Sequence, residues 1–402
     1  MRPRTVVVGA SVAGVRVAQA LRSYGYEGRV VLVGQEDELP YDKPPLSKAV
    51  LAGSAALDDV RLLTEREAAD AEIELELGQA ATRLDLLGSR VHLADGSALG
   101  FDDLVIATGA SARPAGWEHL DGVHSLRTAA DARGLREDLD GGGPVVVIGG
   151  GFIGAEVAAT ANRLGLPDVT VLDATPALLS RAVPEVFGDR LADLHRRHGV
   201  RVRLGARVAT VEQSRARLRI RLDDGSEVDA ATVVVGIGAV PNDAWVTGSG
   251  LKVEDGVVCD PFGRAAPHVF AVGDVSRRQI ARRGRAVRFE HWTNAVEQAA
   301  CVAHTLAHPG DPRAHEPAEY VWTDQYDWKV QIVGDPRAGT ENRLFDRSGD
   351  AFAMVFGAGG RPTGAVVVNW PKALADCRRA LAAAKPFAEL CEELQHLSAK
   401  TQ

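Results

Sequence analysis

The chain has 402 residues, of which 46% are hydrophobic and 25% charged, as is ordinary for a globular protein of roughly two to three domains. A net charge of −8 argues against general affinity for nucleic acid or anionic membranes. No apolar run approaches the ~18 residues of a membrane span, and no hydrophobic leader is apparent. The four cysteines show no C-x-x-C spacing. These features predict a cytoplasmic protein without a metal site or a disulfide framework.

The first predicted element is a β-branched strand that runs into a glycine turn and then an amphipathic helix. Gly9, Ser11 and Gly14 follow the G-x-G-x-x-G plan, with serine at the middle position. Such a turn admits a pyrophosphate, because the helix start presents unpaired N–H groups. The next strand is followed by Gln35 and Glu36, so the acid expected for a ribose comes late or is replaced by an amide. A strand–helix–strand unit without a ligand stays open for this loop alone.

A second glycine loop follows later in the chain and matches the dinucleotide fingerprint in every part. Gly149, Gly151 and Gly154 come directly after a short apolar strand, and Asp173 ends the next strand. An acid at that place favours a free 2′-hydroxyl, and no arginine immediately follows it, so NADH is expected rather than NADPH. Two such loops predict two dinucleotides, a tightly held flavin dinucleotide and an exchanging nicotinamide dinucleotide.

Several further motifs follow in chain order. They are "YDKPPLSK" at 41–48, "FDDLVIATGA" at 101–110, "HVFAVGDV" at 268–275, "EHWTNAVEQA" at 290–299 and "WTDQYDWKVQIVG" at 322–334. With "VVIGGGFIGAEVA" at 146–158, they resemble the two-dinucleotide flavoprotein reductases. More narrowly, they resemble the ferredoxin, putidaredoxin and rubredoxin reductases that serve P450s and ring-hydroxylating oxygenases. The resemblance covers essentially the whole chain.

The resemblance implies an α/β fold with two Rossmann-like dinucleotide-binding domains of the glutathione-reductase type and a small α+β C-terminal domain. Residues 1–112 and 241–317 would form the FAD-binding domain, and residues 113–240 the inserted NAD-binding domain. Residues 318–402 would form the third domain, for which alternating runs predict a small antiparallel sheet. Helices are expected to begin near Lys372 and Pro386.

The same resemblance assigns roles to individual residues. Lys48 and Glu156 would form an ion pair beside the flavin N5 and the nicotinamide, as the catalytic residues. The alternative is that Lys48 is a surface lysine and Glu156 an exposed helix residue. The expected FAD-binding residues are Gly9, Ser11, Ala13, Gly14, Gln35, Glu36, Lys43, Lys48, Ala81, Ala107, Thr108, Gly109, Arg127, Gly273, Asp274 and Trp292. The expected NAD-binding residues are Gly149, Gly151, Ile153, Gly154, Glu156 and Asp173. Gly238 is expected to contact a cofactor where the chain returns to the FAD-binding domain.

Electron transfer to a protein partner is the expected function. Disulfide reductases of this superfold carry a redox cysteine pair just after the first crossover, where this chain has Pro44, Pro45 and Ser47. Electrons should therefore leave from the flavin itself. The resemblance implies that they pass singly to a [2Fe–2S] ferredoxin, which is expected to be acidic. A basic segment would dock this partner, although a merely solvated face is the alternative. Its residues are Arg277, Arg278, Arg282, Arg283, Arg285 and Arg288.

Two other function classes stay open at this point. The first is an NADH oxidase or a reductase of a small acceptor such as a quinone or a monodehydroascorbate-like radical. The second is a flavoprotein whose NADH-driven state switches its binding to another protein, as in the apoptosis-inducing relatives. A monomer or weak homodimer is expected.

Overall fold

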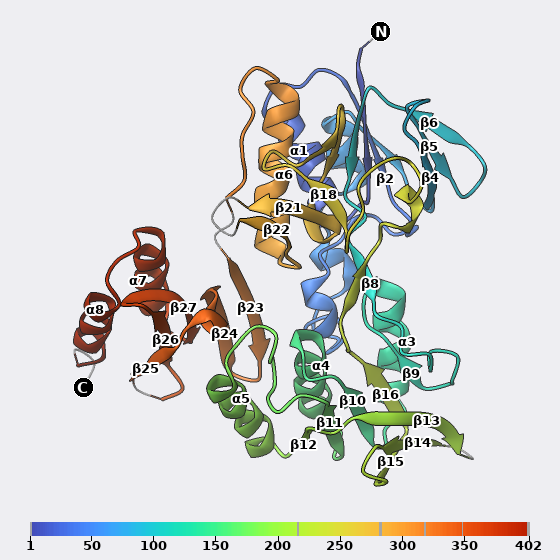
Figure 1. The fold of residues 1–402 in the computed structure, drawn as a ribbon. Helices are drawn as coiled ribbons and strands as arrows, with labels where there is room; N and C mark the ends of the chain where they lie inside the picture. The colour runs from blue at the N-terminus through green and yellow to red at the C-terminus, as the bar shows by residue number, and fades with distance from the viewer. Residues whose placement is uncertain (1, 215–216, 281–283, 317–318, 348, 400–402) are drawn as a thin grey trace. The chain divides into compact units, whose positions relative to one another are not determined.

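The computed structural model describes residues 2–214, 217–280, 284–316, 319–347 and 349–399 (Figure 1). By its internal contacts the chain divides into two compact units. Unit 1 comprises Met1–Lys43, Ala56–Ser111 and Ala239–Pro317, and unit 2 comprises Pro44–Ala55, Ala112–Gly238 and Ala318–Gln402. The three-domain division drawn from the sequence stays a prediction. Within the described ranges, no helix combines the length and the apolar character needed to cross a membrane.

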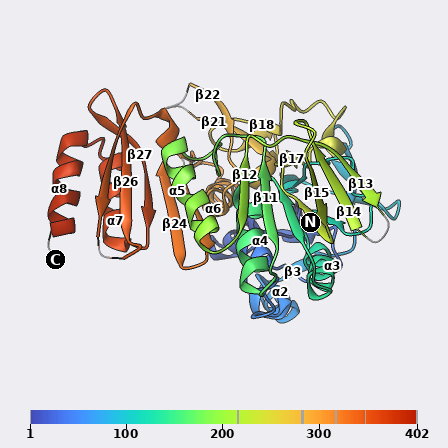
Figure 2. The same cartoon turned by 90° about the horizontal axis from the view of Figure 1, so that it is seen from below.

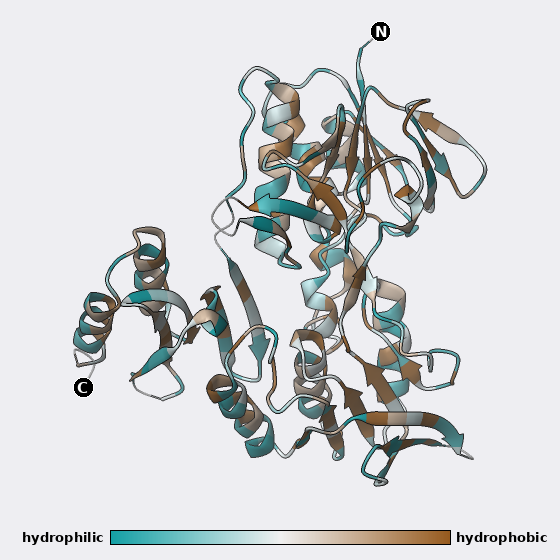
Figure 3. Ribbon diagram, in the orientation of Figure 1, coloured by the Kyte–Doolittle hydropathy of each residue, from teal (hydrophilic) through white to brown (hydrophobic). Residues whose placement is uncertain are grey.

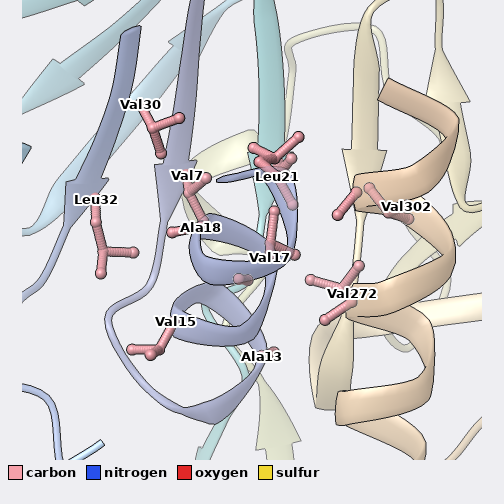
Figure 4. Close-up of a cluster of buried hydrophobic side chains, with 14 of the residues drawn as sticks. Val7, Ala13, Val15, Val17, Ala18, Leu21, Val30, Leu32, Val272 and Val302 are labelled. Atoms are coloured by element: carbon pink, nitrogen blue, oxygen red, sulfur yellow. The ribbon is translucent and has the colours of Figure 1, made fainter. Parts of the chain in front are cut away.

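Unit 1 is built around a six-stranded sheet in the order β19-β20-β7-β1-β2-β3. Its strands are β1 (Arg4–Val8), β2 (Arg29–Val33), β3 (Ile73–Glu76), β7 (Asp103–Ile106), β19 (Arg264–Ala266) and β20 (Val269–Ala271). Neighbouring strands are parallel, except for the antiparallel pair β19–β20. Helices α1 (Val12–Ser23) and α6 (Trp292–Ala307) pack together with the sheet. Their shared core includes Val7, Val17, Leu21 and Val302 (Figure 4).

Smaller elements complete unit 1. A three-stranded antiparallel sheet contains β4 (Ala81–Asp85), β5 (Arg90–Leu93) and β6 (Ala98–Gly100). A second three-stranded sheet is mixed: β18 (Val257–Cys259) is parallel to β21 (Ser276–Ile280), and β21 is antiparallel to β22 (Arg285–Arg288). Short helical segments are α2 (Glu65–Asp70), η2 (Leu57–Val60), η3 (Ala244–Val246) and η4 (Gly273–Val275). The two short strands β8 (Ala110–Ala112) and β17 (Ala239–Pro241) pair with each other.

The first part of unit 2 is a five-stranded parallel sheet in the order β12-β11-β10-β16-β9. Its strands are β9 (Val123–His124), β10 (Val145–Ile148), β11 (Val169–Asp173), β12 (Arg201–Leu204) and β16 (Thr232–Val235). The helices are α3 (Ala129–Asp140), α4 (Phe152–Arg163) and α5 (Glu185–Arg197), and Figure 2 shows α4 beside β11. This part of unit 2 also contains a separate three-stranded antiparallel sheet of β13 (Val208–Ser214), β14 (Arg217–Leu222) and β15 (Glu227–Ala230).

The second part of unit 2 is an antiparallel sheet in the order β23-β24-β27-β26-β25. Its strands are β23 (Tyr320–Gln325), β24 (Trp328–Gly334), β25 (Glu341–Asp346), β26 (Phe352–Ala358) and β27 (Arg361–Val368), with η6 (Pro336–Ala338) between β24 and β25. Helices α7 (Pro371–Ala382) and α8 (Phe387–Ala399) pack on it, which confirms the predicted helix starts. Figure 3 shows hydrophobic residues on many of the strands of the chain, whereas β25 at the edge of this sheet is largely hydrophilic.

Candidate active site

The first glycine loop lies in unit 1, between β1 and α1. Gly9 has a φ of 120°, a backbone conformation that only glycine adopts readily, and a β-carbon there would overlap the carbonyl of Ala107. Ser11 caps α1 with an extended backbone, and its side chain makes no cap hydrogen bond. The N–H groups of the first helical turn are therefore not used by the cap. This loop fits a pyrophosphate, which needs close backbone approach and free helix-terminal donors.

The predicted Gly273-Asp274 motif lies beside this loop. Gly273 has a φ of 73°, and a β-carbon there would come within 2.9 Å of the β-carbon of Ala13. The Gly273 N–H donates to Gln298 Oε1 at 2.8 Å, and the Ser276 hydroxyl donates to the same oxygen at 2.8 Å. Gln298 is buried in α6. Sequence reasoning gave this glutamine no role, although it lies in the "EHWTNAVEQA" motif.

The residues expected at the adenosine end differ in their surroundings. Gln35 is exposed, whereas Glu36 is half-buried. The Glu36 carboxylate accepts hydrogen bonds from the Tyr41 hydroxyl and from Lys43 Nζ, the latter at 2.9 Å. Lys43 therefore forms an ion pair with the acid. A ribose bound here would meet a carboxylate that is already oriented by two donors.

Other predicted flavin residues are placed in unit 1 as follows. The indole N–H of Trp292, the first residue of α6, donates to the Asp42 carboxylate at 2.8 Å. The Thr108 hydroxyl donates to the carbonyl of Asn242 at 2.7 Å, and the Asn242 amide donates to the Thr108 carbonyl at 2.9 Å. This reciprocal pair fixes the backbone that follows β7. Ala81 begins β4 and is half-buried.

The second glycine loop lies in unit 2, between β10 and α4. Gly149 has a φ of 108°, and a β-carbon on Gly154 would overlap the Gly149 carbonyl oxygen. Gly151 caps α4 and offers no side chain to the first-turn N–H groups. Ile153 is 41% exposed on that turn, a large apolar side chain open to a ligand. The loop therefore has the close packing and the free donors that a dinucleotide needs.

Asp173 ends β11, the strand next to the second loop. Its carboxylate accepts the Gly150 N–H, and it accepts the backbone N–H and the hydroxyl of Thr175 at 2.6 Å each. These donors fix the acid against the loop that would hold the pyrophosphate. Gly238 has a φ of 126°, and a β-carbon there would come within 2.8 Å of the Arg181 guanidinium. The role of Asp173 as a ribose-binding acid stays a prediction.

Lys48 and Glu156 meet in unit 2. Residues Pro44–Ser47 form a short 3₁₀ helix, η1, which contacts α4. Lys48 Nζ lies 2.8 Å from Glu156 Oε2, and the Ser47 hydroxyl donates to the same oxygen. Glu156 is only 4% exposed. The alternative of an exposed helix residue is therefore wrong for Glu156, because α4 turns this position toward η1 and β23. In η1 the two prolines fix φ, which stiffens the approach of Lys48.

The other carboxylate oxygen of Glu156 has a donor that the sequence did not reveal. The Thr323 hydroxyl, in β23, donates to Glu156 Oε1 at 2.7 Å. Gln325 Nε2 donates to the Thr323 hydroxyl, and Gln325 Oε1 contacts His195 Nε2. Both residues are buried. Thr323 and Gln325 lie in the "WTDQYDWKVQIVG" motif, which was the available signal. Arg127, expected on the flavin side, lies just before α3, and its N–H donates to Asp131.

The four cysteines are free thiols without a redox partner among the described residues. Burial raises the pKa of Cys259 and of Cys377 to about 12 and also raises the pKa of Cys301 and Cys391. Thiols that resist ionisation are poor nucleophiles for thiol–disulfide exchange. In the described ranges, no three histidine, cysteine or acidic side chains group as metal ligands.

The arginine segment is less exposed than its charge suggests. Arg278 is fully buried and donates to the Ala271 carbonyl, so it cannot contact a partner directly and the prediction is wrong for this residue. Arg277 and Arg288 form ion pairs with Asp255. Arg285 is exposed on β22. Arg282 and Arg283 lie outside the described residues.

The comparisons with known proteins agree with this geometry. Residues 3–299 match the model of the pyridine nucleotide-disulphide oxidoreductases, and residues 320–394 match the reductase C-terminal model. The chain belongs to the pyridine nucleotide-disulphide oxidoreductase family, which uses a flavin and a nicotinamide cofactor, and it carries the C-terminal domain of its reductases. The α/β fold and the family predicted from the motifs are confirmed.

Among its relatives are several reductases, one of them a component of a dioxygenase system. Rhodocoxin reductase of Rhodococcus erythropolis is 36% identical over 95% of this chain and 90% of that protein. The ferredoxin–NAD(+) reductase component of the p-cumate 2,3-dioxygenase system of Pseudomonas putida is 37% identical over 94% and 92%. Putidaredoxin reductase in its covalent complex with putidaredoxin superposes with a TM-score of 0.89 and 32% identity, covering 99% of both chains. The ferredoxin reductase for the CYP199A2 system of Rhodopseudomonas palustris gives 0.92 and 32%, covering 98% and 100%.

Proposed function

We propose that this protein is an NADH-dependent ferredoxin reductase that supplies electrons, through a [2Fe–2S] ferredoxin, to a P450 or a ring-hydroxylating oxygenase. The observation that carries the proposal is the segment after the first crossover, where η1 presents Lys48 to Glu156 and no thiol is present. The relatives named above support the same reading. This chain matches the reductase component of a dioxygenase system and a putidaredoxin reductase over nearly their whole length.

Unit 1 would hold FAD tightly. The first glycine loop and the N–H groups of α1 would receive the pyrophosphate, while Glu36, oriented by Tyr41 and Lys43, would receive the adenosine ribose. Asp274 would bond the ribityl chain, on a turn fixed by Gln298. Trp292, fixed by its bond to Asp42, would lie beside the isoalloxazine. Bound FAD would supply acceptance of a hydride and release of electrons one at a time.

Unit 2 would bind NADH. The second glycine loop would receive the pyrophosphate, and Asp173 would accept the ribose hydroxyls, which disfavours a 2′-phosphate through charge repulsion. Glu156 would seat the nicotinamide through its carboxylate. Lys48 would place a positive charge where negative charge develops during transfer. The roles of these two residues depend on their shared ion pair of 2.8 Å.

The thiols support a route that bypasses sulfur. Because the pKa of every cysteine is raised by burial, none is prepared for the dithiol relay of disulfide reductases. A single-electron acceptor is then the natural partner. An acidic ferredoxin would dock near the β21–β22 hairpin, where Arg277, Arg285 and Arg288 lie. Arg285 is the exposed member of this set, and Arg277 and Arg288 are partly compensated by Asp255.

Stopped-flow reduction by NADH, followed by cytochrome c reduction with and without a [2Fe–2S] ferredoxin, tests the function. Rapid flavin bleaching by NADH and a rate of cytochrome c reduction that depends strongly on ferredoxin are expected. Equal rates without ferredoxin, with rapid reduction of oxygen or quinone, would replace the proposal with a small-acceptor reductase.

The docking surface has its own test. Arg285→Glu should lower the rate at low salt and flatten the dependence of ferredoxin reduction on ionic strength, because steering of charged partners is screened by salt. Arg66→Glu, on an arginine whose side chain is 91% exposed in α2, is the matched control. An unchanged salt dependence in the Arg285→Glu variant would exclude this face.

A further inference from the structure

A line of buried polar side chains connects the β23–β24 turn to the Glu156 carboxylate, entirely within unit 2. Tyr326 OH lies 3.2 Å from His195 Nδ1, and His195 Nε2 lies 2.8 Å from Gln325 Oε1. Gln325 Nε2 lies 3.1 Å from Thr323 Oγ1, which lies 2.7 Å from Glu156 Oε1. The four contacts are continuous, and they join residues up to 167 positions apart.

The chemistry of these groups gives the line a single direction. The carbonyl oxygen of Gln325 can only accept, so His195 Nε2 must donate to it. In a neutral imidazole Nδ1 is then an acceptor, and the Tyr326 hydroxyl donates a hydrogen bond to it. The Gln325 amide donates to Thr323, and the Thr323 hydroxyl donates onward to the carboxylate. Every donor therefore points toward Glu156, and hydrogen bonds aligned in this way polarise one another.

Burial isolates the middle of the line from water, whereas Tyr326 at its start is half-buried. Thr323, Gln325 and His195 are each 0% exposed. Burial also lowers the pKa of His195 to about 4 and raises the pKa of the Tyr326 phenol, so both keep the protonation states that this direction requires near neutral pH. Polar groups buried without partners destabilise a fold, and this set satisfies its own members.

The turn that starts the line is fixed in an unusual conformation. Tyr326 has a φ of 55°, which is uncommon for an aromatic residue and is retained only where packing enforces it. Its ring stacks on His198 with centroids 3.8 Å apart and planes 2° from parallel. The hydroxyl is thereby aimed at His195. The β23–β24 turn, helix α5 and strand β23 thus together supply the side chains that lead to the Glu156 carboxylate.

We propose that Thr323, Gln325 and His195 are positioning residues that hold the Glu156 carboxylate in the geometry used for the nicotinamide. Lys48 and Ser47 fix one carboxylate oxygen, and the buried line fixes the other. With both oxygens fixed, the carboxylate cannot rotate, and the C-terminal sheet acts on the NAD-binding segment through β23. The role toward nicotinamide rests on the proposed function, whereas the hydrogen-bond line itself does not.

The test compares Thr323→Val, which replaces the hydroxyl by a methyl group, with Thr323→Ser, which keeps the hydroxyl. Thr323→Val should raise the KM for NADH roughly tenfold with a smaller change in kcat, the effect expected when a hydrogen bond to a charged group is lost. The KM of Thr323→Ser for NADH should stay near the wild-type value. Thr363→Val is the matched control, because the buried Thr363 hydroxyl in β27 has no hydrogen-bond partner among the described residues. Equal effects of Thr323→Val and Thr363→Val would overturn the proposal.

A double-mutant cycle assigns the effect to Glu156. In a Glu156→Gln background, Thr323→Val should add little further loss, because the two changes act on one interaction. Additive losses would show that Thr323 acts elsewhere and would reject the positioning role. If Glu156→Gln itself left the kinetics with NADH unchanged, the proposed function of Glu156 would fail.

A spectroscopic measurement separates the two failures. The measurement is the ¹⁵N NMR spectrum of the intact protein with ¹⁵N-labelled histidine, in which the His195 signals are those lost in His195→Gln. At pH 7 these signals should be those of the neutral tautomer protonated at Nε2. That result supports the hydrogen-bond line whatever the kinetics show. A charged ring, or a ring protonated at Nδ1, would reverse the direction at this residue and overturn the line.

Discussion

The carbonyl oxygen of Gly9 occupies the space that a β-carbon on Gly14 would need. The turn that follows β1 at Gly9 and the helix that contains Gly14 are thus in direct backbone contact. The same relationship joins Gly149 and Gly154 in unit 2. Each loop therefore tolerates only glycine where the helix crosses its strand, and the approach of a pyrophosphate depends on this contact.

Gly14→Ala should weaken FAD binding. The added methyl group must push α1 away from β1, and overpacking of this kind costs about 1–3 kcal/mol, or roughly tenfold in affinity. The measurement is the FAD-to-protein ratio after gel filtration, with the Kd from titration of the apoprotein. Gly310→Ala is the control, since a β-carbon on Gly310 meets no atom within 4 Å. Full FAD occupancy in the Gly14→Ala variant would contradict the prediction.

Asp173→Asn should reduce the preference for NADH. The amide carries no charge to repel a 2′-phosphate. Its NH₂ group cannot accept a hydrogen bond, so either the Gly150 N–H or the Thr175 N–H loses its acceptor. We expect kcat/KM for NADH to fall about tenfold, while that for NADPH falls less. Steady-state rates with both coenzymes give the ratio. Asp193→Asn, at an exposed position in α5, should leave the ratio unchanged. An unaltered ratio in the Asp173 variant would remove this acid from coenzyme selection.

Lys48→Ala should slow flavin reduction by NADH without loss of FAD. The variant leaves the buried Glu156 carboxylate with neutral donors only, Ser47 and Thr323. Charge-assisted hydrogen bonds contribute about 1.5–3 kcal/mol, so a ten- to hundredfold decrease in the limiting rate is expected. Single-turnover stopped-flow at saturating NADH measures it. Lys329→Ala, an exposed lysine in β24, is the control. A Lys48→Ala variant with an unchanged limiting rate would exclude Lys48 from the transfer step.

Local patterns predicted the parts of the site that depend on neighbouring residues. The glycines of both loops and Asp173 could be recognised because strand, turn and helix follow one another within one crossover unit. The Lys48–Glu156 pair joins positions 108 residues apart, and only the family resemblance suggested it. Contacts from Thr323 and His195 could not be anticipated, because they depend on how β23 packs against α4 and α5.

The burial of Arg278 is a different kind of failure. The run of arginines was interpreted as a surface because charge usually lies in water. Strand β21 alternates, however, with Ser276, Arg278 and Ile280 on its buried side. Period-two alternation through the flanking residues was the available signal, and the density of charge hid it.

His195 gives the protein an acid-sensitive stability. Burial holds its pKa at about 4, against 6.5 for an ordinary histidine. Between these two pH values the unfolded chain binds a proton that the folded chain does not, so stability falls as pH decreases from about 6.5 to about 4. The full difference corresponds to about 3 kcal/mol. His195→Gln keeps a donor for Gln325 but does not titrate. The thermal midpoint of this variant should therefore fall less than that of the wild type between pH 7 and pH 4.5. His119→Gln, at an exposed position in unit 2, should follow the wild type. If the wild type and His195→Gln lost the same stability over this range, His195 would not be the neutral, buried group described.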